Sequence, residues 1–217
     1  MTEDELLTLV VEQFESTGAE TPGWANPRPN MEPPLEEEYS RLLDPGKYRI
    51  MRARVQAWHA VLASLGAVHV ETVGDASVLH LRGMPAETAF RWTPTAPGAL
   101  PVMVTYRSID GVSDAVLEIG AGEPVRLLLA KPECGCDACD DGSEHLLEEI
   151  DGFFTMLVTG GLVRVELPDG YIQTRYNGWD ATGESGAHLG ADGGEQLLSD
   201  ARAGRSQFDV LTGAPWL

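Results

Sequence analysis

The sequence predicts an α+β fold in which an antiparallel sheet is packed on one face by amphipathic helices, after a proline-rich N-terminal arm. Residues 44–66 and 143–160 carry apolar side chains every three or four positions, which is the helical repeat. Between them lie short alternating segments, joined by turns too short for the crossover helices that parallel strands need. The 217 residues suffice for one sizeable domain. We expect the arm over residues 1–34 and a single domain over residues 35–217.

Local signals indicate where the helices begin. Thr2 and Glu5 have the spacing of a capping box, which predicts a first helix over residues 3–16. Asp44 offers an N-cap and Pro45 suits the first position of the most regular helix. The apolar stripe of that helix consists of Tyr48, Met51, Val55, Trp58, Leu62 and Leu65. The other helices are expected over residues 36–43, 143–160 and 193–203.

Strands are predicted where apolar and polar residues alternate between turn signals. Six such segments occupy residues 67–72, 78–81, 89–93, 102–107, 115–119 and 125–130. The first two are expected to pair across a turn at Gly74 and Asp75. A separate hairpin is predicted from residues 163–167 and 171–176 around a Pro-Asp-Gly turn. The glycine-rich end of the chain is expected to be mostly loop.

Residues 18–34 are dense in proline, which disfavours both helix and strand and predicts an extended arm. The prolines are Pro22, Pro27, Pro29, Pro33 and Pro34. Trp24 and Met31 are the large apolar side chains of this segment. We expect both to anchor the arm onto the rest of the chain.

The charge balance bears on the choice of partner. Thirty-four acidic residues against 15 basic ones give a formal net charge of −19. Such a field opposes binding to phosphate backbones and to anionic membrane surfaces, so neither nucleic acid nor membrane is expected as a partner. It favours a basic protein or a cationic ligand, although the same charge also serves solubility. The acidic start of the chain is unlike a signal peptide and no apolar run reaches membrane-spanning length, so a cytoplasmic location is expected.

All three cysteines lie within six residues of one another, at Cys134, Cys136 and Cys139. In a reducing compartment such a cluster points away from disulfides and toward a metal site, a redox site or packed thiols. Thiolates are strong ligands for zinc, and His145 is the nearest fourth donor in the sequence. The predicted metal-binding set is therefore Cys134, Cys136, Cys139 and His145, with zinc as the cofactor, or with none if the thiols only pack. The C-x-C-x-x-C spacing differs from the usual pair of C-x-x-C knuckles.

Three other interpretations of the turn stay open. In a redox role, the start of a helix near Ser143 would lower the pKa of Cys139, but the flanking acids oppose a thiolate and no neighbouring lysine or arginine follows to offset them. In a calcium role, residues 137–148 match an EF-hand loop only degenerately. In a purely structural role, Asp141 or Ser143 caps the helix while the small thiols pack beneath it.

Signatures of common enzyme classes do not occur in a supporting context. The sequence lacks a dinucleotide-binding glycine motif, a P-loop, a zincin motif and a nucleophile elbow. His59 lies beside the apolar stripe of the 44–66 helix and is expected to be half-buried rather than a ligand. No catalytic residue is assigned from the sequence.

Three stretches carry a family resemblance. The segment PGWANPRPNMEPPLEEEYSRLLDPGKYRIMRARVQAW, the turn CGCDACDD and a chain end with APW resemble an uncharacterised family common in actinobacteria, a domain of unknown function. The most specific parts are residues 39–58 and 134–140. The resemblance implies a soluble bacterial protein with the cysteine turn as a family feature, and it supplies no activity to transfer. The family motif commonly continues with glutamate where this chain has Asp141.

These observations favour a non-enzymatic binding or interaction protein with an acidic surface and a structural cysteine-rich turn. The alternative is an enzyme or thiol redox protein that uses the turn from Cys134 to Cys139, with zinc as a possible cofactor. The first interpretation depends on the net charge and on the missing catalytic signatures, and the second depends on the cysteine turn.

Overall fold

The computed structural model describes all 217 residues apart from the side chain of Ala191. The chain forms two compact units by its internal contacts: residues 1–93 with 101–151, and residues 94–100 with 152–217. Helices and two antiparallel sheets are present together, which confirms the α+β class. The single domain over residues 35–217 stays a prediction.

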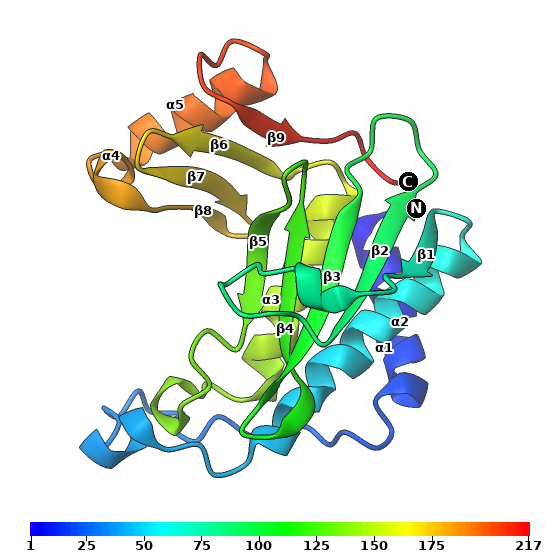
Figure 1. Cartoon of the computed structure of the whole chain (residues 1–217), viewed down its shortest axis with the longest axis vertical. Helices are drawn as coiled ribbons and strands as arrows, with labels where there is room; N and C mark the ends of the chain where they lie inside the picture. The colour runs from blue at the N-terminus through cyan, green and yellow to red at the C-terminus, as the bar shows by residue number, and fades with distance from the viewer. The chain divides into compact units, whose positions relative to one another are not determined.

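The first unit is built on a five-stranded sheet with the order β1-β2-β3-β4-β5 (Figure 1). Its strands are β1 (Val68–Thr72), β2 (Thr88–Pro94), β3 (Val102–Ile109), β4 (Val112–Ala121) and β5 (Arg126–Lys131). The pairs β2–β3, β3–β4 and β4–β5 are antiparallel, as the short connections predicted. The β3–β4 hairpin turns at Asp110 and Gly111, which both have positive φ. Asp-Gly is a favoured pair for such a turn.

Two helices of the first unit, α1 (Glu3–Thr17) and α2 (Ile50–Ser64), pack against each other, and α2 also contacts β1 and β4. The predicted capping box of α1 is present, since Thr2 and Glu5 exchange side-chain and backbone hydrogen bonds. Trp58 and Leu62 of α2 are fully buried, as are Leu117 and Ile119 of β4. Each such side chain contributes about 1.5–3 kcal/mol by leaving water. The core of this unit therefore lies between α2 and the sheet.

A buried polar contact fixes α2 against α3 (Ser143–Val158), which begins in the first unit. Arg54 donates from Nε to Asp151 Oδ1 over 2.8 Å, and Trp58 Nε1 donates to the same oxygen over 2.8 Å. Arg54 is 4% exposed. Because a buried guanidinium without a carboxylate partner is strongly destabilising, this contact holds the first half of α3 in place.

Three local predictions need correction. Residues 36–43 form only a short 3-10 helix, η1 (Glu36–Ser40), and the helix predicted to start at Pro45 opens as a second one, η2 (Pro45–Arg49), before α2. Asp44 makes no capping bond with its side chain. The predicted strand over residues 78–81 is absent: η3 (Ala76–Val78) stands at its start because the Asp75 carboxylate accepts from the backbone of Ser77. A local Asx bond of this kind competes with strand pairing.

The second unit has a four-stranded sheet with the order β8-β7-β6-β9. Its strands are β6 (Val163–Leu167), β7 (Gly170–Arg175), β8 (Gly178–Ala181) and β9 (Val210–Thr212), and its short helices are α4 (Gly183–Ala187) and α5 (Ala191–Arg202). The predicted β6–β7 hairpin is confirmed. Val163, Val165 and Ile172 form its core with Leu198 and Ala201.

The glycine-rich end was predicted to be mostly loop with one helix over residues 193–203. The helix is confirmed as α5, but the prediction of loop is wrong, because this end also supplies β8, α4 and β9. A Cβ on Gly194 would collide with the indole of Trp179, and one on Gly186 would lie 2.8 Å from the Cβ of Ala181. These glycines permit close packing of a helix on a neighbouring strand, so their number reflects close approach rather than disorder.

The arm is extended between α1 and η1, as predicted, but only one of its two expected anchors holds. Trp24 is half-buried, whereas Met31 is 93% exposed and sits at a positive φ of 57°. Met31 therefore does not pin the arm. Among the helices of the described residues, none combines the length and apolar character needed to cross a membrane.

Candidate metal centre in the cysteine turn

The cysteines lie on the connection between β5, which ends at Lys131, and α3, which begins at Ser143. A single 3-10 turn, η4 (Asp137–Cys139), is its regular element. Gly135 and Gly142 both have positive φ, at 80° and 88°. A Cβ on Gly142 would lie 2.6 Å from the backbone nitrogen of Asn26, so the proline-rich arm passes directly against the turn. Glycine is required there for both reasons.

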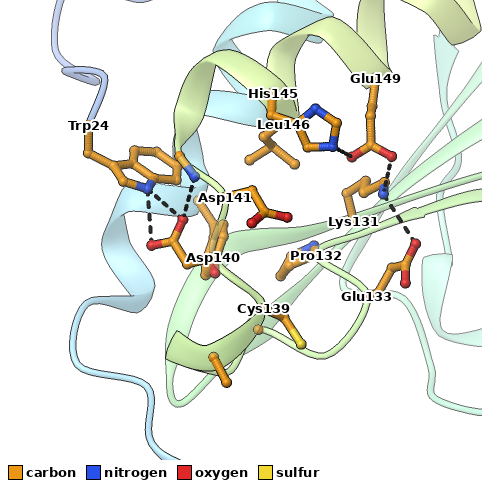
Figure 2. Close-up of a pocket in the computed structure, with 14 residues that line it drawn as sticks. Trp24, Lys131, Pro132, Glu133, Cys139, Asp140, Asp141, His145, Leu146 and Glu149 are labelled. Carbon is orange, nitrogen blue, oxygen red and sulfur yellow. Dashed lines mark hydrogen bonds and ion pairs between the residues drawn. The ribbon is translucent and has the colours of Figure 1, made fainter. Parts of the chain in front are cut away.

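Trp24 joins the arm to the end of the turn. Its backbone nitrogen donates to Ser143 Oγ over 2.9 Å, and its carbonyl accepts from the backbone nitrogen of Ser143 over 3.1 Å. Its indole Nε1 donates to Asp140 Oδ1 over 2.8 Å (Figure 2). Asp140 also pairs with Lys47 and accepts from the backbone nitrogen of Gly142. Asp140 therefore makes the side-chain-to-backbone bond at the entrance to α3, where Asp141 or Ser143 was predicted to do so.

Two arginines hold the middle of the turn. Nη2 of Arg28 donates to the carbonyl oxygens of Asp137, Ala138 and Asp140, at 3.1, 2.7 and 3.1 Å. Nε of Arg41 donates to Asp137 Oδ2 over 2.8 Å, while the carbonyl of Arg41 accepts from the backbone nitrogen of Asp137 over 2.8 Å. The backbone of the turn is thus fixed by polar groups of the arm and of η1–η2, independently of the thiols.

The three thiols converge on one point of this fixed backbone. Their sulfur atoms all lie within 4.8 Å of one another, and those of Cys134 and Cys136 are 3.1 Å apart. Thiolates on one tetrahedral zinc stand roughly 3.8 Å apart, given a Zn–S length of about 2.3 Å. Cys134 and Cys139 are exposed and Cys136 is half-buried. The prediction of thiols packed beneath the helix is therefore wrong, and the cluster could hold a metal ion.

Two acids beside the thiols, Asp137 and Asp140, form ion pairs with basic residues that are distant in the sequence. Burial would raise the pKa of Asp140, but hydrogen bonds from Lys47 and Trp24 outweigh it and hold that pKa below its usual value. At Asp137, hydrogen bonds from Arg41 and the backbone of Leu43 likewise outweigh the effect of burial and lower the pKa. Both groups are carboxylates paired with cations. The expected opposition to a thiolate is therefore offset at Asp137 and Asp140.

The thiols differ in acidity. Burial acts to raise the pKa of Cys136, but hydrogen bonds from Cys134 and Cys139 and from the backbone near η4 lower it overall. Hydrogen bonding with Cys134 and Cys136 raises the pKa of Cys139 to about 12. Cys136 consequently loses its proton before Cys139, whereas the sequence pointed to Cys139.

His145 lies outside the group formed by the thiols. It is exposed on the first turns of α3, with Nδ1 3.9 Å from Glu148 Oε2 and Nε2 3.9 Å from Glu149 Oε2. The structure thus brings together Cys134, Cys136 and Cys139 and does not add the fourth predicted ligand. Metal binding by the full set stays a prediction.

The calcium interpretation fails on the donor set. In an EF-hand the first loop position supplies a carboxylate ligand. Here that position is Asp137, whose carboxylate accepts from Arg41 and from the backbone of Leu43. A strand, β5, leads into the turn where an EF-hand has a helix.

A pocket of about 420 Å³ opens beside the turn (Figure 2). Cys139 is the cysteine on its wall, and the carboxylate of Asp141 is turned into it. Lys131 is buried at one side, paired with Glu149 at 2.7 Å and Glu133 at 3.2 Å. The charged side chains of the pocket are therefore mainly acidic next to the exposed thiol.

The residues that sequence reasoning missed are the partners of the turn from the other end of the chain: Trp24, Arg28, Arg41 and Lys47. They lie 93 to 119 positions away from the groups they contact. One signal could have found them. The two most specific stretches of the family resemblance, residues 39–58 and 134–140, contain Arg41 and Lys47 on one side and Asp137 and Asp140 on the other.

Comparison with known proteins gives one match. A search of the curated proteins and a search of the solved structures each returned none. The model of a family of unknown function, DUF6226, matches residues 10–217 and so spans the arm, the turn and both compact units. With nearly its whole length matched, the chain belongs to the family of unknown function DUF6226.

Proposed function

We propose that this is a metal-binding protein whose Cys134, Cys136 and Cys139 hold one thiophilic ion as thiolates. The observation that carries the proposal is the convergence of three sulfur atoms within 4.8 Å on an exposed turn. Zinc is the ion expected from the sequence. A reducing compartment such as the cytoplasm would keep the three thiols available.

The support of the turn indicates what kind of metal site this is. In small zinc domains the metal provides the folding energy, and the loop is disordered without it. Here Arg28, Arg41 and Trp24 hold the turn through backbone and carboxylate bonds that involve no sulfur. The ion is therefore cargo or cofactor on a prefolded turn, and we expect it to bind and leave without unfolding the chain.

The test is metal content and free thiols measured on the same sample, purified anaerobically with reductant. We expect one ion per chain, either as isolated or after reconstitution with zinc, and thiols that react with a chromogenic reagent only after a chelator is added. The triple variant C134S/C136S/C139S should bind no ion. It should also keep the melting temperature of the metal-free parent to within about 4 °C, because the thiols contribute little to packing. A parent chain that neither carries nor takes up metal would refute the proposal.

A second candidate is binding to a basic protein or cationic ligand, supported by how the basic residues are used. Ion pairs within the chain engage Arg28, Arg41, Lys47, Arg52, Arg54, Arg107, Lys131, Arg164, Arg175 and Arg205. The excess acid stays exposed, for example at Glu3, Asp4 and Glu5 of α1.

Electrostatic capture of this kind weakens as salt shortens the Debye length, from about 30 Å at 0.01 M to about 3 Å at 1 M. The measurement is retention of a polylysine probe on the immobilised chain across that range. Retention that does not change with salt would eliminate this candidate.

A further inference from the structure

We infer that the site selects ions whose coordination three thiolates complete, with monovalent copper and trivalent arsenic as its representatives, in preference to zinc. This inference rests on the proposed metal site and specifies its ligand class. It depends on the absence of a fourth donor at the thiols and on the fixed backbone that keeps such a donor away.

The other donors near the thiols are committed elsewhere. In the part of the chain that the structure describes, the metal-capable group at this point contains the three cysteines and no histidine or carboxylate. Asp140 is bound by Lys47, Trp24 and the backbone of Gly142. The Asp140 side chain is buried, with 8% exposed. If it bound the metal ion, the ammonium group of Lys47 would be left without its carboxylate partner.

His145 and Asp141 are the remaining candidates for a fourth ligand. His145 is fixed to α3, and its ring faces Glu148 and Glu149. Asp141 turns its carboxylate into the neighbouring pocket (Figure 2). The backbone on either side of Asp141 is tied down, since the carbonyl of Asp140 accepts from Arg28 and the nitrogen of Gly142 donates to Asp140. A movement of the Asp141 backbone toward the sulfurs would break those bonds.

Coordination chemistry then decides between ions. Zinc prefers four tetrahedral ligands, so zinc held by three thiolates has to complete its shell with water or another outside ligand. Thiolates are soft ligands that select monovalent copper, which three sulfurs can satisfy. Trivalent arsenic carries a lone pair and is likewise complete with three sulfurs. Arsenous acid forms three As–S bonds with the three thiols, whose protons leave with its hydroxides as three waters, and no oxidation or reduction occurs.

The local charge suits such ions. Three thiolates with monovalent copper carry a net charge of −2, which needs cations nearby, and the arsenic adduct is neutral. Arg28, Arg41 and Lys47 surround the turn and offset the charges of Glu38, Asp137 and Asp140, so these ion pairs add no net negative charge beside the thiols. Two of the three thiols are exposed, so an ion has a path to the cluster.

The experiment uses the full reduced chain under anaerobic conditions. Monovalent copper is titrated against bathocuproine disulfonate, arsenite is titrated by its thiolate absorbance, and zinc is titrated against a chromophoric chelator. We expect copper and arsenite each to bind one per chain and each to displace zinc at one equivalent. Sulfur coordination numbers from X-ray absorption should be three for both. Copper displacing zinc while arsenite does not would contradict the shared three-thiolate requirement.

Variants separate a three-ligand from a four-ligand site. Each of C134S, C136S and C139S should weaken arsenite binding more than the roughly 10–100-fold that changes outside the ligand sphere cause. His145→Gln and Asp141→Asn should leave the affinities for copper, arsenite and zinc unchanged within about twofold, well below that range. A tenfold loss of zinc affinity in either variant, or zinc that resists one equivalent of arsenite, would overturn the inference while leaving a metal site. Failure of all three ions to bind would instead overturn the proposed function itself.

Discussion

The indole nitrogen of Trp24 donates to Oδ1 of Asp140 over 2.8 Å, although the two residues are 116 positions apart. This bond joins the proline-rich arm to the entrance of α3, next to the cysteine turn. Lys47 pairs with the same carboxylate and lies 5.3 Å from the centre of the Trp24 ring. The geometry of the turn therefore depends on a segment that carries none of its sulfur ligands.

Trp24→Phe tests that dependence. The variant keeps an aromatic ring but removes the donor to a buried carboxylate, which we expect to lower the free energy of unfolding by about 1.5–3 kcal/mol. Urea unfolding measures the change, and hydrogen exchange should show faster exchange in residues 132–142. The control is Met31→Ala in the same arm, which should stay within about 0.5 kcal/mol because that side chain is 93% exposed. Equal effects of the two substitutions would contradict the anchoring role of Trp24.

Arg28→Gln removes the group that binds three carbonyls of the turn. Because such supporting contacts typically affect metal binding by about 10–100-fold, we expect a loss of arsenite affinity in that range with all thiols still titratable. The matched control is Arg205→Gln, which removes an exposed arginine paired with Asp200 in the other unit. An unchanged affinity in the Arg28 variant would show that the thiols hold their own arrangement.

Oxidation of the thiols should abolish metal binding. The sulfurs of Cys134 and Cys136 are 3.1 Å apart, so a two-electron oxidant such as diamide should link them, taking up the two thiol protons and two electrons as it is reduced to its hydrazine. We expect loss of metal binding, protection when the site is loaded, and recovery with a reductant. Peptide mass mapping identifies the linked pair. Cys136→Ser is the control, and a disulfide that diamide forms in that variant as fast as in the parent would argue against this pair.

His59 makes stability depend on pH. It is half-buried, lies 5.5 Å from the Trp92 ring, and has its pKa lowered by burial. The histidine of the unfolded chain titrates at about pH 6.5. Between that pH and the lower folded pKa, the folded chain therefore binds fewer protons at this position than the unfolded chain. The stabilisation from the neutral ring is present above that pH and is lost as pH falls through the lower folded pKa.

The measurement is urea unfolding between about pH 7 and pH 4.5, the region in which an unperturbed or lowered histidine titrates. His59→Gln should flatten the fall in the free energy of unfolding on the acid side. His69→Gln, at an exposed histidine on β1, should retain the slope of the parent. A His59 variant with the parental slope would assign the acid sensitivity to other groups.

Features encoded by neighbours in sequence could be predicted. The capping box of α1 and the Asp110–Gly111 hairpin depend on residues within four positions of one another, and both are present. The strand expected over residues 78–81 failed because a single side-chain bond from Asp75 outweighed an alternating pattern. The glycine-rich end failed because glycine also permits close packing, as at Gly194 against Trp179.

In the candidate site, too, the features that depend on neighbouring residues were predictable and those that depend on distant residues were not. The clustering of the thiols and their place between a strand and a helix follow from adjacent residues and were predictable. Their exposure and the compensation of Asp137 and Asp140 depend on Arg41 and Lys47, more than 90 positions earlier, and no local pattern encodes such pairs. The position of His145 likewise follows from the direction in which α3 leaves the turn, which spacing alone does not specify.

The contact between Arg28 and the turn also sets an order of events during synthesis. Arg28 is made 109 residues before the carbonyl of Asp137 that it binds, and the sheet of the first unit is encoded between them. Closing so long a loop is entropically unfavourable until the intervening strands have paired. A nascent chain therefore carries three unarranged thiols, and the receptor for an ion exists only after the sheet has folded. A chain that binds the ion is therefore a chain whose first unit has already folded.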